Sequence, residues 1–160
     1  ETIGKYPQNQ IVSNGVHLGR SLFAQRVWDV LQAGRYLATR SDVAADRLRC
    51  VGLGPSAVLA LYAAALGDGF EEVEAVRPLA SYRFFIENDQ PQPLWLCVPN
   101  ILKVADVAQA AALAASSSVT IVEAVGYGNA PLDATAAQSE FAFAEAVHKL
   151  VGTPGRFTVR

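Results

Sequence analysis

The sequence has no methionine and contains only two cysteines and two histidines among its 160 residues. Because position 1 is Glu1, we expect the chain to be a mature, excised or engineered segment of a longer reading frame. Cys50 and Cys97 lie inside apolar runs, so they are predicted to be buried free thiols, which leave the compartment undetermined. His17 and His148 are isolated and share no metal-ligand spacing with the cysteines. The sequence predicts neither a metal site nor a cofactor.

Positive charge is also scarce and nowhere clustered. The 13 Lys and Arg residues against 15 Asp and Glu residues give a net charge of -2. Such a chain lacks the basic surface with which proteins bind nucleic acids or anionic membranes. No apolar run approaches the roughly 20 residues that span a bilayer, and no charged-then-apolar signal pattern opens the chain. Neither nucleic acid nor a membrane is predicted as a partner.

The apolar content is high enough for one sizeable core. Hydrophobic residues make up 51% and charged residues 18% of the chain, and no interdomain linker is visible. We therefore expect residues 1–160 to form a single domain. Residues 1–17 are polar and contain Pro7 and Asn14-Gly15, so they are predicted to be an irregular leader.

Beyond the leader, helical and extended patterns alternate. Ser21 and Asp133 are predicted to cap two of the helices. The alternation predicts an α/β fold with a small, mostly parallel sheet flanked by helices. The expected elements are helices over 21–39, 56–66, 101–113 and 133–151, strands over 48–51, 72–79, 119–122 and 156–160, and a loop over 82–93 that forms a lid, an interface or a packed connection.

The turn between the first strand and the second helix carries two possible motifs. The stretch Gly52-Leu-Gly-Pro-Ser-Ala57 matches the G-x-G-x-x-G/A fingerprint of dinucleotide-binding domains. That fingerprint needs an acidic residue at the carboxyl end of the next strand. Glu74 has the right count but lies early in its strand, and Arg77-Pro78 ends it. A Rossmann-like dinucleotide-binding domain remains an alternative.

The same turn fits a nucleophile elbow, G-x-S-x-G, which also joins a strand to a helix. In this alignment Gly52 takes the first glycine, Gly54 takes the nucleophile position and Ser56 takes the last small residue. Gly54 has no side chain with which to attack a carbonyl. Ser56 lies in the first helical turn, so we expect its hydroxyl to point away from the corner and to serve packing or capping.

Longer stretches on both sides of the turn resemble the carboxyl-terminal half of one α/β-hydrolase group. The group is that of the acetyl xylan esterase-like hydrolases, which are related to prolyl oligopeptidase. The resemblance covers most of the chain from Leu18 onward. The residues that carry it are Leu18-Gly-Arg-Ser-Leu22, Arg26-Val-Trp-Asp-Val-Leu31, Tyr36-Leu-Ala-Thr-Arg-Ser-Asp-Val43, Asp46-Arg-Leu48, Leu59-Ala-Leu-Tyr-Ala-Ala-Ala-Leu66, Pro99-Asn-Ile-Leu102, Ala105-Asp106 and Pro131-Leu132.

The resemblance implies a serine hydrolase with a Ser, an acid and a His. The nucleophile position carries Gly54, and the acid position, placed by Pro131-Leu132, carries Gly126. The His is expected beyond the last helix, where residues 152–160 contain none. Glu123 precedes the acid position by three residues and is expected to be solvated or ion-paired.

The resemblance also implies a missing first half, with the early strands and an oxyanion-hole amide. A half-sheet leaves an open strand edge that needs covering. The predicted function is therefore a non-catalytic, esterase-like module of a larger protein or assembly. Its expected partners are the remainder of a parent polypeptide or a second copy, with a carbohydrate ester as a possible ligand. The enzymatic alternative is a carboxylesterase of the acetyl xylan esterase type with a displaced or missing triad.

Overall fold

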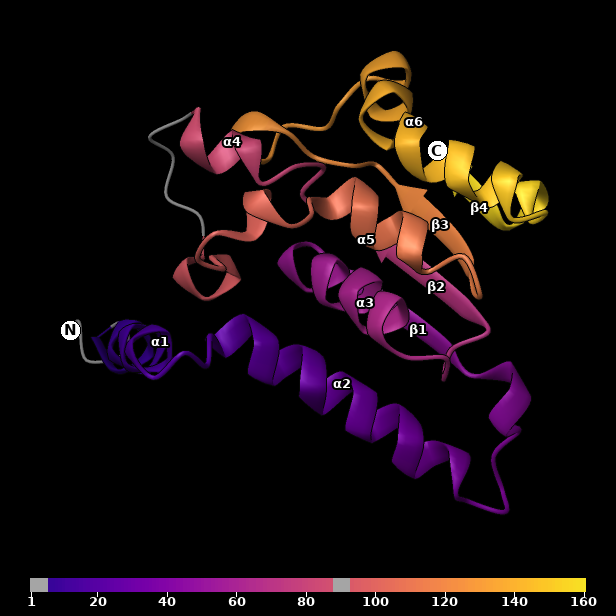
Figure 1. Ribbon diagram of the computed structural model, residues 1–160, viewed down its shortest axis with the longest axis horizontal. Helices are drawn as coiled ribbons and strands as arrows, with labels where there is room; N and C mark the ends of the chain where they lie inside the picture. Colours follow the sequence, from indigo (N-terminus) through magenta and orange to yellow (C-terminus); the bar gives the residue numbers. More distant parts are fainter. Residues whose placement is uncertain (1–5, 88–92) are drawn as a thin grey trace.

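A four-stranded parallel sheet forms the centre of the computed structural model, which describes residues 6–87 and 93–160 (Figure 1). The strands lie in the order of the sequence, and each pairs in parallel with the next. The predicted α/β class and the small parallel sheet are confirmed. The strands are β1 (Arg49–Leu53), β2 (Glu72–Val76), β3 (Ser118–Val122) and β4 (Phe157–Val159).

Helices connect the strands, and their caps follow the sequence closely. The Ser21 hydroxyl accepts a hydrogen bond from the Ala24 amide at 3.2 Å, and the Asp133 carboxylate accepts one from the Ala136 amide at 2.8 Å. Both predicted caps are confirmed. The α-helices are α1 (Tyr6–His17), α2 (Leu22–Ala38), α3 (Pro55–Leu66), α4 (Arg83–Ile86), α5 (Val107–Leu113) and α6 (Ala134–Leu150), and the short 3-10 turns are η1 (Ala45–Arg47), η2 (Leu94–Leu96), η3 (Ile101–Lys103), η4 (Tyr127–Asn129) and η5 (Pro154–Arg156).

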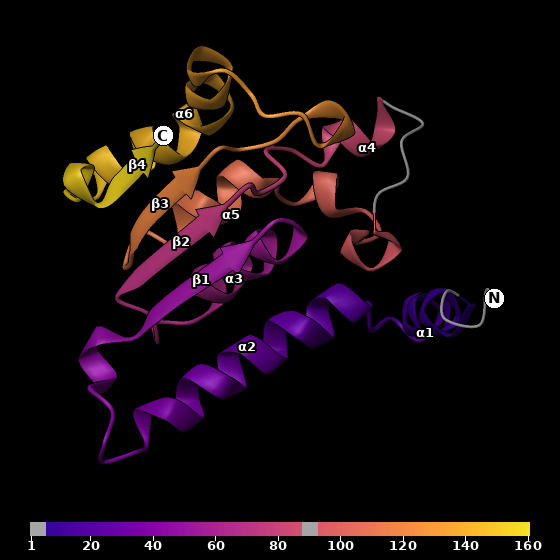
Figure 2. The same cartoon turned by 180° about the vertical axis from the view of Figure 1, so that it is seen from behind.

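The core lies between one face of the sheet and the helices α3, α5 and α6. Alternate strand residues point into it, with Val73, Ala75, Val119 and Ile121 almost completely buried. Small and branched side chains of α3 pack closely on them, as the nearly continuous apolar pattern of that helix predicts. The helices stand in front of the sheet in Figure 1 and behind it in Figure 2.

The other face of the sheet has no described helix over it (Figure 2). Val51 and Leu53 of the edge strand β1 point to this face and are 50% and 65% exposed. Near the amino ends of the strands the face is charged, since Arg49 pairs with Glu74 and, at 3.6 Å, with Glu72. Parallel sheets in α/β proteins are normally covered on both faces, so this open face is unusual.

The helix α2 lies alongside α3, beyond the edge strand β1 (Figures 1 and 2). Among the described residues, no strand pairs with the outer edge of β1. The predicted open strand edge therefore exists in this structure, and it lies beside α2.

The predicted irregular leader over 1–17 is wrong for residues 6–17, because Tyr6–His17 forms α1, and residues 1–5 lie outside the described residues. Pro7 is the second residue of this helix, where an amide needs no partner. The Asn14-Gly15 pair is not a turn. Instead, Gly15 admits the close return of the chain, since a Cβ there would lie 2.6 Å from the Arg20 carbonyl oxygen.

Three other elements differ from the expectation by more than one or two residues at a boundary. The second strand ends at Val76 rather than at 79, because Arg77 adopts a left-handed conformation with φ of 55°. The helix expected over 101–113 is divided, since the Asp106 capping box starts α5 anew. The loop over 82–93 contains the short helix α4, and its residues 88–92 lie outside the described residues.

Candidate functional site

Three residues stand in a row at the carboxyl edge of the sheet. Gly54, Arg77 and Glu123 each follow the last residue of β1, β2 and β3, and these last residues are aligned in register. The φ angles are 56°, 55° and 48°, so all three residues are left-handed. Such conformations are rare for residues with a side chain and gather at functional sites. This edge is also where open α/β sheets bind ligands.

The two glycines of the strand-to-helix corner have different roles. A Cβ at Gly52 would lie 2.5 Å from the Cα of Ala57, so only glycine lets α3 approach β1 this closely. A Cβ at Gly54 would meet no atom within 4 Å, although the backbone there has φ of 56° and ψ of -130°. The corner is therefore sterically closed at Gly52 and open at Gly54.

A cavity of about 200 Å³ lies at this corner. The elbow and the turn after β3 both line it, through Gly54, Val125 and Asn129. Arg77 also lines it, and its guanidinium donates to the backbone carbonyl of Asn129 at 3.3 Å. Tertiary structure thus brings together the two segments in which the sequence placed the nucleophile and acid positions.

Among the described residues, Arg77 is the one charged side chain that lines this cavity. It also lines a neighbouring cavity of about 360 Å³ together with Glu123 and Arg160. Arg77 and Glu123 form an ion pair of 3.5 Å, as expected for a strand-end carboxylate. Both side chains are about half exposed, so water screens the pair and it contributes little to stability. The guanidinium is therefore available to an anionic or carbonyl group.

The other predicted site residues, Ser56 and Gly126, do not line this cavity. Ser56 is exposed in the first turn of α3 and does not line the cavity. A Cβ at Gly126 would lie 2.8 Å from the Cδ2 atom of Leu132, so a side chain at this position would meet that leucine. Gly126 instead closes its turn, with its amide donating to the Ala130 carbonyl at 2.9 Å.

Neither histidine lines the cavity. His148 is fully buried between α5 and β4, with its ring centroid 4.9 Å from that of Phe157 and its Nε2 atom 3.2 Å from the Ala111 carbonyl. Because a carbonyl only accepts, Nε2 carries the proton. Burial lowers the pKa of His148, so the ring stays neutral. His148 is a core residue, and His17 is exposed at the end of α1.

The cysteines offer no alternative nucleophile. Cys50 lies within β1 and Cys97 follows η2, and both are free and partly buried. Burial raises the pKa of each thiol, so little reactive thiolate is present near neutral pH.

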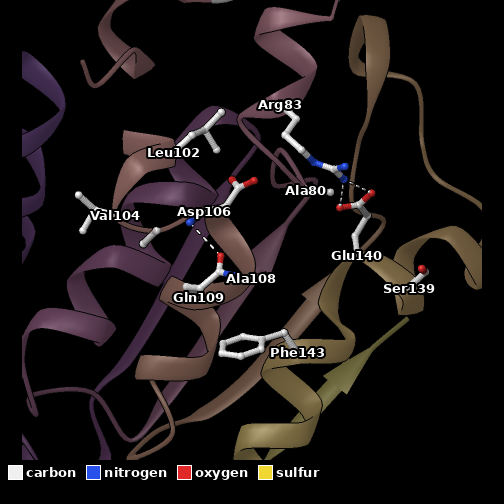
Figure 3. A pocket seen from close by; sticks show the side chains of 11 residues that line it. Ala80, Arg83, Leu102, Val104, Asp106, Ala108, Gln109, Ser139, Glu140 and Phe143 are labelled. Carbon is white, nitrogen blue, oxygen red and sulfur yellow. Dashed lines mark hydrogen bonds and ion pairs between the residues drawn. The ribbon is translucent and has the colours of Figure 1, made fainter. Parts of the chain in front are cut away.

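A larger cavity of about 440 Å³ lies over α5 and α6 (Figure 3). Its charged groups already have hydrogen-bond partners. Arg83 donates to both carboxylate oxygens of Glu140 at 2.8 and 2.9 Å, and the Ser81 hydroxyl donates to Asp106 at 2.5 Å. Asp106 also accepts from the amides of Tyr82 and Val107. This network holds α4 against α5 and α6, and sequence analysis missed it because its members are distant in the chain.

The dinucleotide alternative requires a carboxylate at the end of β2. Glu74 is the third residue of that strand and pairs with Arg49 on the open face. The residue that follows β2 is Arg77, so an arginine occupies the position at which the fingerprint requires a carboxylate.

No group of three or more His, Cys, Asp or Glu side chains that would hold a metal occurs in the described part of the chain. Within that part, no single helix has the length and hydrophobicity to cross a membrane. Only the bent pair Leu94–Lys103 and Val107–Leu113, with 80° between its two parts, passes by length and composition.

Neither a protein-family model nor a curated protein matches the sequence. Among the solved structures that share the fold, two are esterases by name. One, from Bacteroides fragilis and assigned as an acetyl xylan esterase, has a TM-score of 0.74 and 14% identity over 93% of this chain. The other, methylesterase BT1017, has a TM-score of 0.61 and 22% identity over 88% of this chain. The chain spans 38% of the first protein and 31% of the second, and it has an esterase-like α/β fold.

Proposed function

We propose that this chain is a non-catalytic, esterase-like module that retains the backbone of a nucleophile elbow without its nucleophile. The observation that carries the proposal is Gly54, which combines φ of 56° and ψ of -130° with open space around the position of a Cβ. An elbow presents a strained residue to the substrate at the start of a helix. Acyl transfer needs an oxygen or sulfur atom at that point, and glycine has neither.

The general base is the second missing component. In serine hydrolases a histidine takes the proton from the attacking hydroxyl. His148 is neutral and packed in the core, and His17 ends α1. Binding without turnover is the function that suits these residues, with the Arg77 guanidinium and the cavity at Gly54 receiving an ester carbonyl. The name of the first structural neighbour, an acetyl xylan esterase, favours a carbohydrate ester as the ligand class.

The proposal includes a partner that covers the open edge of β1 and the open face of the sheet. Val51 and Leu53 are exposed, and among the described residues no strand pairs with the outer edge of β1. An unpaired parallel edge with apolar side chains favours association. The partner is the remainder of a longer polypeptide or a second copy of this chain.

Two assays test the absence of catalysis. Purified chain is incubated with p-nitrophenyl acetate and with a fluorophosphonate probe, with Ser56→Ala as the matched variant. We expect neither turnover above the buffer rate nor labelling of either protein. Labelling of Ser56, or of any other serine, would overturn the proposal in favour of a carboxylesterase with a displaced triad.

A thermal shift assay with NAD and NADP tests the nucleotide alternative. Ligands that bind only the folded state raise the melting temperature by mass action. We expect no shift, and an increase of several degrees would support a dinucleotide-binding domain instead.

A further inference from the structure

A separate cavity of about 300 Å³ lies between α4 and the segment 97–103, and Gly54 does not line it. Most of its wall is apolar, and two of the apolar side chains, Ile86 and Leu102, are 77% and 39% exposed. Large apolar side chains gathered around a hollow mark a small-molecule site, because a bound apolar group removes them from water. The cavity therefore favours a ligand with a hydrocarbon body.

Two polar side chains, those of Asn100 and Lys103, line the same cavity. Both residues are exposed, so a ligand can reach them. Asn100 directly precedes η3, where asparagine commonly caps a backbone amide, but here its side chain makes no hydrogen bond in the described part of the chain. Its backbone carbonyl accepts from the Lys103 amide at 3.0 Å, which holds the two residues together. The Asn100 carboxamide is therefore free to donate to a ligand.

Within residues 6–87 and 93–160, Lys103 is the one charged residue that lines the cavity, and it forms no ion pair. Lys149, by contrast, pairs with Glu145 at 2.6 Å. A lysine carries three donors on a flexible stem, which can lie on an apolar wall while the ammonium reaches the mouth of a cavity. An uncompensated positive charge thus borders an apolar hollow.

We propose that this cavity binds a small monocarboxylate with an apolar body, represented by octanoate. Its carboxylate accepts hydrogen bonds from the Lys103 ammonium and the Asn100 carboxamide, and its hydrocarbon chain lies on Phe85 and Ile101. Hydrogen bonds between a cation and a carboxylate are stronger than neutral ones, so the charged end fixes the orientation of the ligand. This site is independent of the proposed function, because it involves neither the elbow nor hydrolysis.

Octanoate, octan-1-ol and acetate separate the two parts of the site, since octan-1-ol lacks the charge and acetate lacks the apolar body. Binding is measured by titration of the ¹⁵N-labelled chain, following the amide shifts of Cys97, Ile101 and Lys103. We expect octanoate to shift these amides at lower concentration than either of the other probes. Lys103→Gln should bind octanoate about 3- to 10-fold more weakly and octan-1-ol unchanged.

Lys149→Gln is the control, because it removes the same charge from α6, where Lys149 does not line the cavity. It should bind octanoate as wild type does, and Lys103→Arg, which keeps the charge, should retain most of the affinity. The proposal fails if octanoate leaves the three amides unshifted or shifts only those of Val51 and Leu53 on the open face. It also fails if Lys103→Gln and Lys149→Gln weaken binding equally. Should Lys103→Gln unfold, wild type still provides the test, since equal affinity for octanoate and octan-1-ol would overturn the proposal.

Discussion

The amide of Gly54 donates a hydrogen bond of 2.8 Å to the carbonyl of Val76, the last residue of the neighbouring strand. On the helix side, the Gly54 carbonyl accepts from the Ala57 amide at 2.9 Å. The corner is thus held from both β2 and α3. The backbone conformation of Gly54 is strained, and such a conformation persists only where the surrounding structure holds it. These two hydrogen bonds hold it.

Substitution of Gly54 by serine should lower stability without creating activity. A side chain has room there, so the cost is conformational, about 1–3 kcal/mol in the free energy of unfolding. Chemical denaturation measures this cost, with Gly54→Ala as the control that should lose the same amount. Ester hydrolysis by Gly54→Ser should stay at the buffer rate, because no histidine lines the cavity. Measurable turnover would show that a general base is within reach.

Substitution of Gly52 by alanine should destabilise the protein for a different reason. The added methyl would overlap the backbone of α3, 2.5 Å from the Ala57 Cα, and neither element can move freely. We expect a loss near the upper end of the range of about 1–3 kcal/mol for overpacking. Gly155→Ala is the control, because a Cβ there meets nothing within 4 Å, and it should change stability by less than about 0.5 kcal/mol. Equal effects of the two substitutions would contradict the close contact between β1 and α3.

Acidification should destabilise the fold through His148. Burial lowers its pKa in the folded state, whereas the unfolded chain titrates near pH 6.5. Below that pH the unfolded chain binds the extra proton, so stability is full above about pH 6.5 and is lost as the pH falls toward the folded-state pKa.

Urea denaturation between about pH 5 and 8 measures this dependence, which reaches at most about 1.4 kcal/mol per pH unit for one group. His148→Gln keeps a donor for the Ala111 carbonyl but does not titrate, so its stability should vary less in this range. An unchanged pH dependence in the variant would assign the effect to other groups.

The double substitution Val51→Lys and Leu53→Lys should abolish self-association of the isolated chain. Both side chains lie on the open face of β1, where charge opposes apolar packing. Sedimentation equilibrium should show wild type above the monomer mass of 17.0 kDa and the double variant at it. Leu150→Lys is the control, because Leu150 is 85% exposed on α6 and its charge should leave association unchanged. A monomeric wild type would exclude a second copy as the partner and leave a longer polypeptide as the occupant.

Local patterns in the sequence determined most of the framework. The alternation of helices and strands, the caps at Ser21 and Asp133, and the glycine corner at 52–54 all follow from periodicity and side-chain chemistry over a few residues. Helix α1 was missed because its polar residues give a weak apolar pattern, and its stability depends on contacts with α2 and η2.

The site itself depended on tertiary structure. Arg77 and Glu123 are left-handed where β2 and β3 end, and neither residue type signals that conformation in the sequence. The burial of His148 against Phe157, and the cavity between α4 and the segment 97–103, arise from packing between separate elements of the chain. The sequence by itself determined that Gly54 brings no nucleophile to the corner, because the identity of a residue fixes the chemistry of its side chain. Only the tertiary structure decided that the corner is open and lies beside Arg77, because the position of a strand end depends on its neighbours in the sheet.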